Sequence, residues 1–458
     1  MFETVEIPVW LLWVAGLLAA VATLDRILGP SVRWFFRRRM ERAVARLNKR
    51  LDRPIEPFRL AQRQDMIIRL VYDRKVMEAV AAHAAKTGVP PSVAFEEARR
   101  YAREIVPGFS ATLYFGFATR AARWLSRALY RVRIGRVDAA LRAIDRRATV
   151  IFVMNHRSNM DYVLVTWLVA ERSAISYAVG EWARVWPLSR LIRAMGAYFI
   201  RRGSRNALYR RVLARYVQTA AAEGATQAFF PEGGLSLDGR VGPARMGLLG
   251  YVVQGFDPAG RDVVFVPVGL AYDRVLEDRL LTEADRTGIR RFRARPLSIL
   301  AFVARTALRL IRRRFGGFGT AAVGFGAPVS LRAALAKGMT TEGLGAHLMA
   351  EIARVVPVVP VPLIAAALAQ GPASRAELAE RIAALAVRLV AEGAILQLAP
   401  QGMARTLDEG LAPLIGRGIV TEGPGGTLTP AGDGARLLQF YAAPVLQRLE
   451  RVSAMQQT

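Results

Sequence analysis

The sequence predicts an α/β fold in which a mixed, largely parallel sheet is flanked by helices. Short apolar runs alternate with helical patterns between residues 148 and 331, and this alternation is typical of parallel sheets covered by helices. Thr149–Met154 is the clearest strand, because it is apolar and rich in β-branched residues and a helix-opening pattern follows it directly. The chain has 458 residues, of which 53% are hydrophobic, so it can bury a sizeable core and form two or three domains.

The first segment, residues 1–36, is predicted to be a membrane anchor helix followed by a basic collar. Ile7–Leu24 is an uncharged apolar run of eighteen residues, about the shortest length that crosses a bilayer as a helix. Acidic residues precede this run and arginines follow it, so the bulk of the protein is expected on the cytoplasmic side of the membrane. The alternative is an interfacial helix that lies in one leaflet.

Residues 37–147 are predicted to form a helical N-terminal region. Pro90–Val106 has a proline-led start, an acidic first turn and a basic end, all of which favour a helix. Gly108–Arg133 alternates aromatic and arginine residues at helical spacing. This pattern fits an amphipathic helix that faces the membrane, and it fits a helix that packs on the following domain equally well.

The central α/β domain is predicted over residues 148–331. The strands expected after Thr149–Met154 are Ala174–Val179, Tyr198–Ile200, Thr226–Phe230, Val263–Val268 and Thr320–Phe325. Two of the helices expected between them are Glu181–Met195 and Asn206–Ala222. Pro296–Phe315 is an apolar helical pattern studded with arginines, which fits an interfacial helix on anionic lipid and a solvated basic face equally well.

Residues 332–458 are predicted to form a mostly helical C-terminal domain. Ser374–Glu392 has the pattern of one strongly amphipathic helix, and Leu411–Gly432 contains the turn-rich sequence of a β-hairpin. Helices around such a hairpin resemble a winged-helix arrangement. A nucleic-acid partner is not expected, because this segment is not especially basic.

Composition narrows the class of partner. The formal net charge of +28 indicates an anionic partner such as a phospholipid surface or a phosphorylated substrate, and the alternative is a basic surface that is only solvated. The high hydrophobic content favours a membrane surface over nucleic acid. The chain has no cysteine, which excludes disulfides, a thiol nucleophile and a zinc–thiolate site.

The stretch Ala148–Val165 carries the chemistry that the sequence predicts. His156 lies in the turn between the strand and the next helix, and open α/β sheets place their chemistry at that end of a strand. Ser158 followed three residues later by Asp161 is a capping-box pattern, so His156 lies outside the helix and can fold back over its first turn. A carboxylate bonded to one imidazole nitrogen would leave the other nitrogen as a base. The alternative is a helix-capping Asp161 beside an ordinary loop histidine.

Four sequence blocks resemble those of the membrane-bound glycerol-3-phosphate acyltransferases, glycerolipid acyltransferases with a His-x4-Asp motif. The first block is NHRSNMDY, around His156 and Asp161. The others follow in the family's order: GAYFIRR at 196–202, FFPEGGLS at 229–236 and VVFVPVGLAYDRV at 263–275. The resemblance implies a glycerolipid-acyltransferase-like fold, with residues 148–331 as the catalytic domain. It implies transfer of a fatty acyl group from acyl-CoA or acyl carrier protein to the sn-1 hydroxyl of glycerol-3-phosphate, the first step of phospholipid synthesis.

The resemblance also implies a role for particular residues. His156 is the expected general base, oriented by Asp161, and backbone N–H groups at Gly233 and Gly234 are candidate donors to the oxyanion. Glu232 is expected either to bind the free hydroxyl of the acceptor or to hold its loop. The expected phosphate contacts are Arg157, Arg201, Arg202, Arg240 and Arg245. Ser158 and Pro267 are expected to shape the wall of the cleft. No metal and no cofactor other than the acyl thioester co-substrate is expected.

Departures from the family pattern leave alternatives open. Leu235 stands where the third block normally has an arginine, which removes an expected phosphate contact. Asn155 and Pro231 look like the residues of sn-2 enzymes, which acylate 1-acylglycerol-3-phosphate. The alternatives are therefore an sn-2 acyltransferase or a non-catalytic membrane-bound binding protein of the same fold. For the preferred function we expect a bacterial inner membrane location, with the catalytic domain on the cytoplasmic face and anionic phospholipid as a partner.

Overall fold

The computed structural model describes residues 62–456 apart from 136–141, 171–172, 181–187, 202, 290–307, 309–316 and 433, and scattered residues between 8 and 60. The chain separates into two units, Met1–Ile55 and Glu56–Thr458. In this described part, no helix is both long enough and apolar enough to cross a bilayer. The predicted anchor and the predicted helix Pro296–Phe315 lie almost entirely outside the described residues.

An eight-stranded sheet forms the centre of the second unit. Its strand order is β1-β7-β6-β2-β5-β3-β4, and β8 pairs with β6 beside β7. The pairings of β2, β3, β4 and β5 are all parallel, whereas β7 and β8 run antiparallel to β6. The strands are β1 Arg131–Ile134, β2 Thr149–Met154, β3 Ser176–Val179, β4 Tyr198–Phe199, β5 Gln227–Phe229, β6 Val263–Tyr272, β7 Thr320–Phe325 and β8 Val329–Ser330. The predicted mixed, largely parallel sheet is confirmed.

Strand β1 corrects one expectation. The helical pattern of the sequence continues to Arg133, but the helix ends at Leu129 and the next residues form β1. Arg131 and Arg133 alternate there with Val132 and Ile134, and this strand spacing lets β1 pair in parallel with β7. The pairing partner lies almost two hundred residues away in the sequence, so the local pattern did not reveal it.

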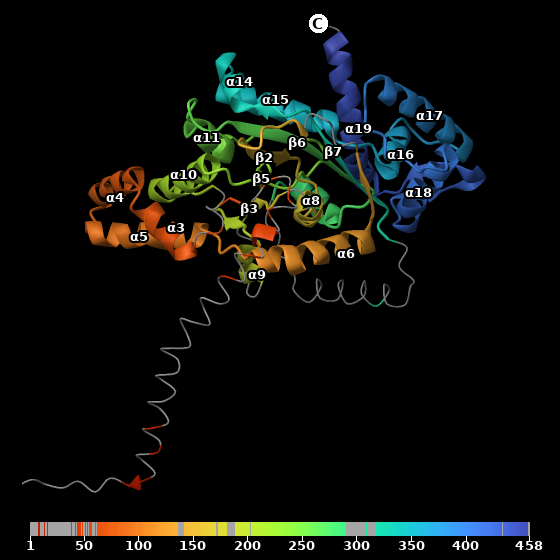
Figure 1. Cartoon of the computed structure of the whole chain (residues 1–458). Coiled ribbons are helices and arrows are strands. Elements are labelled where there is room, and N and C mark those ends of the chain that lie inside the picture. Colours follow the sequence, from red (N-terminus) through yellow and green to blue (C-terminus); the bar gives the residue numbers. More distant parts are fainter. Residues whose placement is uncertain are drawn as a thin grey trace, which may run out of the picture. The chain divides into compact units, whose positions relative to one another are not determined.

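Helices cover both faces of the sheet (Figure 1). Before β1 come α3 Arg63–Val71, α4 Arg74–Thr87, α5 Pro91–Ile105, the π-helical segment η1 Thr112–Ala118 and α6 Thr119–Leu129. Between the strands lie α8 Met160–Ala170, α9 Leu188–Ala194, α10 Ala207–Ala222, α11 Met246–Gln254 and α12 Asp278–Thr287. After β8 come α14 Leu331–Ala336, α15 Thr341–Val355, α16 Pro360–Leu368, α17 Arg375–Ala391, α18 Met403–Gly416 and α19 Gly434–Gln456. The hairpin of β9 Val420–Glu422 and β10 Leu428–Pro430 lies between α18 and α19, where the sequence predicts it.

Two hydrophobic cores lie on opposite faces of the sheet. Along β2, Val150 and Phe152 belong to one core, whereas Ile151 and Val153 belong to the other. The first core continues into α16, α17, α18 and α19, and the second contains residues of α3, α4, α5, α10 and α15. The boundaries predicted at residues 147 and 331 stay predictions, because both cores run across them.

Asp273, the residue after β6, joins the sheet to the C-terminal helices. One carboxylate oxygen accepts the N–H of Thr320 at 2.6 Å, and the other accepts the N–H of Val361 at 2.8 Å in the first turn of α16. Asp273 therefore satisfies a helix N-terminus from another element. Burial raises the pKa of Asp273 to about 6.

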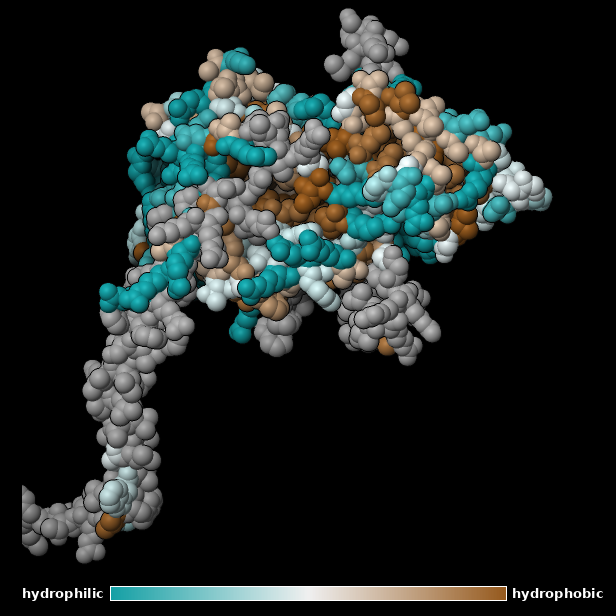
Figure 2. All heavy atoms as spheres, turned by 45° about the vertical axis from the view of Figure 1, so that its right-hand side comes forward, coloured by the Kyte–Doolittle hydropathy of each residue, from teal (hydrophilic) through white to brown (hydrophobic). Residues whose placement is uncertain are grey.

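The surface of the C-terminal helices is partly apolar. Val387 and Val390 of α17 and Ile415 of α18 are exposed. Figure 2 shows hydrophobic residues gathered among hydrophilic ones over this side of the molecule.

Candidate active site

His156 and Asp161 meet at the carboxyl end of β2. The Nδ1 atom of His156 lies 3.0 Å from Oδ2 of Asp161, and both side chains are buried. The chain turns after Met154, and α8 begins at Met160, so the histidine lies outside the helix and the aspartate lies in its first turn. Asn155 fixes the start of the turn, because its side chain accepts the N–H and donates to the C=O of Leu270 on β6 at 2.8 and 3.0 Å.

The carboxylate of Asp161 accepts hydrogen bonds on both oxygens. Oδ2 accepts the backbone N–H groups of Arg157 and Ser158 at 2.7 and 3.0 Å, and Oδ1 accepts the hydroxyl of Tyr272 at 2.7 Å. Burial and the charge of Asp161 raise the pKa of Tyr272, which keeps this hydroxyl protonated as a donor. The carboxylate is thus held in one orientation, and it fixes the Nδ1–H tautomer of His156.

The imidazole of His156 lies against aromatic rings. It stacks on Phe230 with ring centroids 3.8 Å apart and an angle of 16° between the planes. Tyr162 meets it edge-on, with centroids 5.5 Å apart. Within the described residues, Nε2 of His156 has no hydrogen-bond partner, so the geometry leaves this nitrogen available to act as a base.

Glu232 of the third block holds the backbone of His156. Its Oε2 accepts the N–H of His156 at 2.8 Å, and its Oε1 accepts the N–H of Gly242 at 2.8 Å. Ser236 of the same block donates its N–H to the carbonyl of His156 at 2.9 Å. Burial raises the pKa of Glu232 to about 7, although the two N–H donors act in the opposite direction. Of the two predicted roles, these contacts correspond to holding the loop.

Gly233 follows in a tight turn with a φ of 69°. Its N–H donates to the carbonyl of Phe230 at 3.0 Å, so this group is engaged and does not point to a developing oxyanion as the sequence suggested. A Cβ at position 233 would lie 2.8 Å from Cδ of Arg245. The arginine side chain therefore runs directly over this turn, whose positive φ favours glycine.

Ser158 and Asn159 are held by Glu277, in the loop between β6 and α12. The hydroxyl of Ser158 donates to Oε2 of Glu277 at 2.8 Å, and the side-chain amide of Asn159 donates to Oε1 at 3.0 Å. The Ser158 hydroxyl oxygen accepts the N–H of Met160 at 3.2 Å, whereas the predicted capping box pairs it with the N–H of Asp161. The return half of the box does form, because Asp161 accepts the N–H of Ser158. Burial raises the pKa of Glu277. Ser158 is completely buried, and lies behind the turn rather than on an open wall.

Among the predicted phosphate contacts, Arg245 and Arg240 lie near the third block but differ in their surroundings. Arg245 is exposed beside Gly233, and within the described residues it makes no ion pair. Arg240 forms a two-pronged ion pair with Glu450 of α19, with both N–O distances at 2.7 Å.

Arg201 and Arg157, two more of the predicted phosphate contacts, are engaged with protein groups in this arrangement. Arg201 binds both oxygens of Glu104, at 2.9 and 2.6 Å, which raises its pKa further. It follows β4, which is separated from β2 by β5 and β3, or roughly 14 Å across the sheet. Arg157 is buried and donates to the carbonyl of Gly239. Arg202 lies outside the described residues.

Two further positions have apolar surroundings. Pro267 is buried within β6, where it pairs with Val153 of β2 and its carbonyl accepts the N–H of Gly326 at 2.8 Å. Leu235 packs against the core that contains α8 and α19. An arginine at this position would face that core, so the departure from the family pattern has a local structural counterpart.

Within the described ranges, no cluster of His, Asp or Glu side chains is placed to hold a metal ion.

Sequence reasoning missed three residues of the site: Phe230, Tyr272 and Glu277. Tyr272 had a usable signal, because it lies at an even spacing from Val268, which pairs with the last residue of β2. It therefore points from β6 to the same face, beyond the end of β2, where the turn lies. Glu277 gave no such signal, because it lies in a loop that approaches the turn only in the folded chain.

Two family models match this chain. The acyltransferase model matches residues 136–271, and the model of the glycerol-3-phosphate acyltransferase C-terminal region matches residues 303–446. The resemblance to the glycerol-3-phosphate acyltransferases is confirmed. The first match contains the whole turn from Asn155 to Asp161 and the third block, and the second contains α15 to α18 and the aromatic residues of α19.

Relatives named glycerol-3-phosphate acyltransferase show the same correspondence. That of Aeromonas hydrophila is 28% identical over 60% of this chain and 33% of the relative. That of Shewanella amazonensis is 29% identical over 63% of this chain and 35% of the relative. This chain thus spans about a third of the length of these curated relatives. A 1-acyl-sn-glycerophosphate acyltransferase from Thermotoga maritima is 18% identical over 64% of this chain and 98% of that chain, with a TM-score of 0.31 that supports no further comparison.

Proposed function

We propose that this chain transfers a fatty acyl group from an acyl thioester to the sn-1 hydroxyl of glycerol-3-phosphate. The observation that carries the proposal is the contact of His156 with Asp161 at the end of β2, within the segment that matches the acyltransferase model. The second match, to a glycerol-3-phosphate acyltransferase C-terminal region, favours this acceptor over other alcohols.

In the proposed mechanism, His156 is the general base. Nδ1–H donates to Asp161, and Nε2 takes the proton from the acceptor hydroxyl as its oxygen attacks the thioester carbonyl. The tetrahedral intermediate collapses by breaking the C–S bond, and the imidazolium returns the proton to the leaving thiolate. An ester C–O bond and a thiol S–H bond replace the O–H and C–S bonds. General-base catalysis of this kind contributes about 10²- to 10⁴-fold.

Arg245 is the proposed contact for the acceptor phosphate. It is exposed, it runs over the turn of Gly233, and Glu232 in the same turn bonds to His156. A guanidinium binds two phosphate oxygens at once, which would orient the glycerol hydroxyl as well as hold it. Recruitment of Arg201 would require the phosphate to displace Glu104.

We propose that the reaction takes place at an anionic membrane, on the cytoplasmic face that the arginines after Ile7–Leu24 predict. The segment η1–α6 supports the membrane contact, because Phe117 and Trp124 are 59% and 62% exposed on it. They lie seven residues apart and therefore on one face of a helix. Arg120, Arg123 and Arg127 accompany them, and the sequence has no acidic residue from Val106 to Arg136. Exposed aromatic rings among arginines are typical of helices that bind anionic lipid. The acyl donor is either acyl-CoA or acyl carrier protein. Both donors are anionic, so the basic surface of this chain suits either of them.

The test uses labelled glycerol-3-phosphate and an acyl thioester, with wild-type protein and His156→Ala in lipid vesicles. We expect 1-acylglycerol-3-phosphate from the wild type and at least about a hundredfold slower formation by the variant. His347→Ala is the matched control, because His347 is exposed on α15, outside the site, and should keep the wild-type rate. Equal rates for wild type and His156→Ala would exclude the mechanism.

The second candidate is an sn-2 acyltransferase that uses 1-acylglycerol-3-phosphate. Asn155 and Pro231 favour it, because these two residues of the first and third blocks look like those of sn-2 enzymes. The same assay with 1-acylglycerol-3-phosphate as acceptor separates the two, since the preferred acceptor will show the higher kcat/KM. No transfer to either acceptor would favour a non-catalytic binding protein.

A further inference from the structure

Two consecutive aromatic residues of the C-terminal helix α19, Phe440 and Tyr441, reach the two sides of the active-site turn. Phe440 lies under Arg157, the residue after His156, with the guanidinium carbon 4.6 Å from the ring centroid. The same guanidinium donates to the carbonyl of Gly239 in the third-block loop. Arg157 thereby joins the active-site turn to the third-block loop and to α19.

Tyr441 reaches the other side of the turn through Asp278. Its hydroxyl donates to Oδ2 of Asp278, and it accepts the N–H of Val275 at 3.1 Å. Arg417, the residue after α18, pairs with the same Asp278 at 2.6 Å and donates to the Tyr441 hydroxyl at 3.1 Å. Both Asp278 and Tyr441 are buried, so these bonds are shielded from water.

Asp278 directly follows Glu277, whose carboxylate holds Ser158 and Asn159. The C-terminal residues therefore fix the loop between β6 and α12 at Asp278, and the neighbouring Glu277 accepts hydrogen bonds from the active-site turn. Ser158 in turn donates its N–H to Asp161, the partner of His156. An unbroken series of contacts thus runs from α19 to the imidazole.

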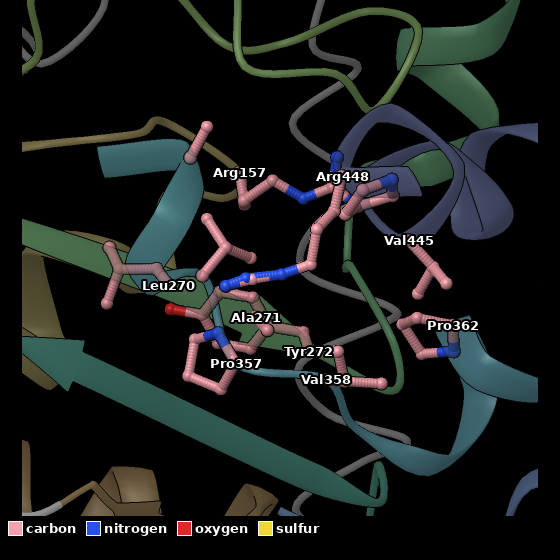
Figure 3. Close-up of a pocket in the computed structure, with 12 residues that line it drawn as sticks. Arg157, Leu270, Ala271, Tyr272, Pro357, Val358, Pro362, Val445 and Arg448 are labelled. Atoms are coloured by element: carbon pink, nitrogen blue, oxygen red, sulfur yellow. The ribbon is translucent and has the colours of Figure 1, made fainter. Parts of the chain in front are cut away.

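Figure 3 shows Arg157 at a small hollow beside β6. Arg157 and Arg448 reach from the turn and from α19 into a hollow lined by Leu270, Ala271 and Tyr272 of β6. The guanidinium of Arg157 is held there by the Gly239 carbonyl and lies over the Phe440 ring.

We propose that Tyr441 and Arg417 are positioning residues for the reaction: by fixing Asp278 and Glu277, they hold the turn that aligns Asp161 with His156. The proposal rests on the proposed function for its link to turnover. It assigns a role to two residues of the region that matches the second family model: they set the geometry of the active site through Asp278 and Glu277.

The first test is a double-mutant cycle measured on kcat with full-length protein in vesicles. Tyr441→Phe keeps the ring and removes the hydroxyl, and we expect it to lower kcat by about tenfold with little change in either KM. In a Glu277→Ala background, where the series is already broken, the same change should lower kcat by less than about threefold. The proposal would be overturned if Tyr441→Phe lowered kcat by the same factor in both backgrounds, or if it did not lower kcat at all.

Tyr198→Phe is the matched control, because Tyr198 is also fully buried and its hydroxyl bonds to Gln227 at 3.4 Å, in the core behind the sheet. Its effect on kcat should be small and the same in both backgrounds. If Tyr441→Phe does not fold, Arg417→Gln enters the same cycle, since it leaves the bond between Tyr441 and Asp278 in place.

A second readout does not depend on turnover. The chain has only three histidines, so the ring signals of His156 can be assigned in ¹⁵N-histidine-labelled protein by comparison with His83→Gln and His347→Gln. We expect Tyr441→Phe to shift the His156 ring signals and Tyr198→Phe to leave them unchanged. Unchanged His156 signals in Tyr441→Phe would overturn the positioning role even if the wild type is active. Shifted signals in an inactive wild type would contradict only the proposed function.

Discussion

Glu232 and His156 are joined through the backbone: a buried carboxylate oxygen of Glu232 accepts the His156 N–H at 2.8 Å. Glu232 therefore fixes the position of the His156 backbone, whereas Asp161 fixes the orientation of the imidazole ring. This division of roles separates the expected effects of changing the two carboxylates.

Glu232 should give the protein a distinctive dependence of stability on pH. The pKa of this group is about 7 in the folded protein, against an ordinary value of 4.5. Between these values the folded chain holds a proton that the unfolded chain has lost, so the contribution of Glu232 to stability falls as the pH rises from 4.5 to 7. Relative to Glu232→Gln, we expect the free energy of unfolding of the wild type to fall by about 3 kcal/mol over this range and then to level off.

Denaturant unfolding at a series of pH values measures this difference. Glu380→Gln, at an exposed site on α17, is the control and should give a curve parallel to the wild type. Parallel curves for wild type and Glu232→Gln would show that Glu232 titrates as an ordinary carboxyl group.

Arg245→Ala should raise the KM for glycerol-3-phosphate by about tenfold or more, because it removes the exposed guanidinium beside Gly233. The KM for the acyl thioester should change much less. Arg240→Ala is the matched control, since Arg240 belongs to the same loop but is already paired with Glu450. Steady-state kinetics with each substrate varied in turn checks the prediction, and similar changes in both KM values for Arg245→Ala would argue against a phosphate contact.

Gly239→Ala should destabilise the protein by about 2 kcal/mol or more. The backbone there has a φ of 89°, and a Cβ would lie 2.1 Å from the carbonyl oxygen of Phe440. Gly418→Ala measures the destabilisation that comes from the backbone conformation alone, because Gly418 has a φ of 65° and open space around the position. We expect about 1 kcal/mol for that control. Thermal unfolding of both variants measures the difference in destabilisation. Equal destabilisation would mean that the backbone of α19 moves to accommodate the added Cβ at little cost in free energy.

The absence of cysteine makes the proposed membrane contact of the segment η1–α6 testable with single labels. Phe117→Cys and Trp124→Cys, each spin-labelled in the full chain on anionic vesicles, should be accessible to oxygen and protected from a water-soluble nickel reagent. Val387→Cys on α17 is the control; that site is 73% exposed and also apolar, and we expect it to stay accessible to the nickel reagent. The same accessibility at all three sites would argue against a membrane contact of the segment η1–α6.

Much of the site followed from local sequence patterns. The run Thr149–Met154 and the spacing of Ser158 and Asp161 were enough to place His156 at a strand end beside a carboxylate, and the structure has this contact. The same patterns could not reveal that Arg157 is buried against the ring of Phe440 or that Arg201 is paired with Glu104. A lone sequence shows which residues carry charge. Which partners neutralise that charge depends on elements far apart along the chain.

The strand β1 and the loop residue Glu277 illustrate the same limit. β1 is recognisable only through its pairing with β7, and Glu277 only through its bonds to Ser158 and Asn159. Both contacts join segments more than a hundred residues apart, so no periodicity within a short window reports them.

Helix α16 is buried along its whole length, and the carboxylate of Asp273 at the end of β6 holds its first turn. A shortened chain that ends after the first family match would therefore leave a wide apolar face of the sheet open to water and a buried acid without one of its donors. Such a fragment should aggregate rather than serve as a minimal enzyme. Engineering of this scaffold, including any exchange of modules between relatives, has to treat Glu56–Thr458 as one unit.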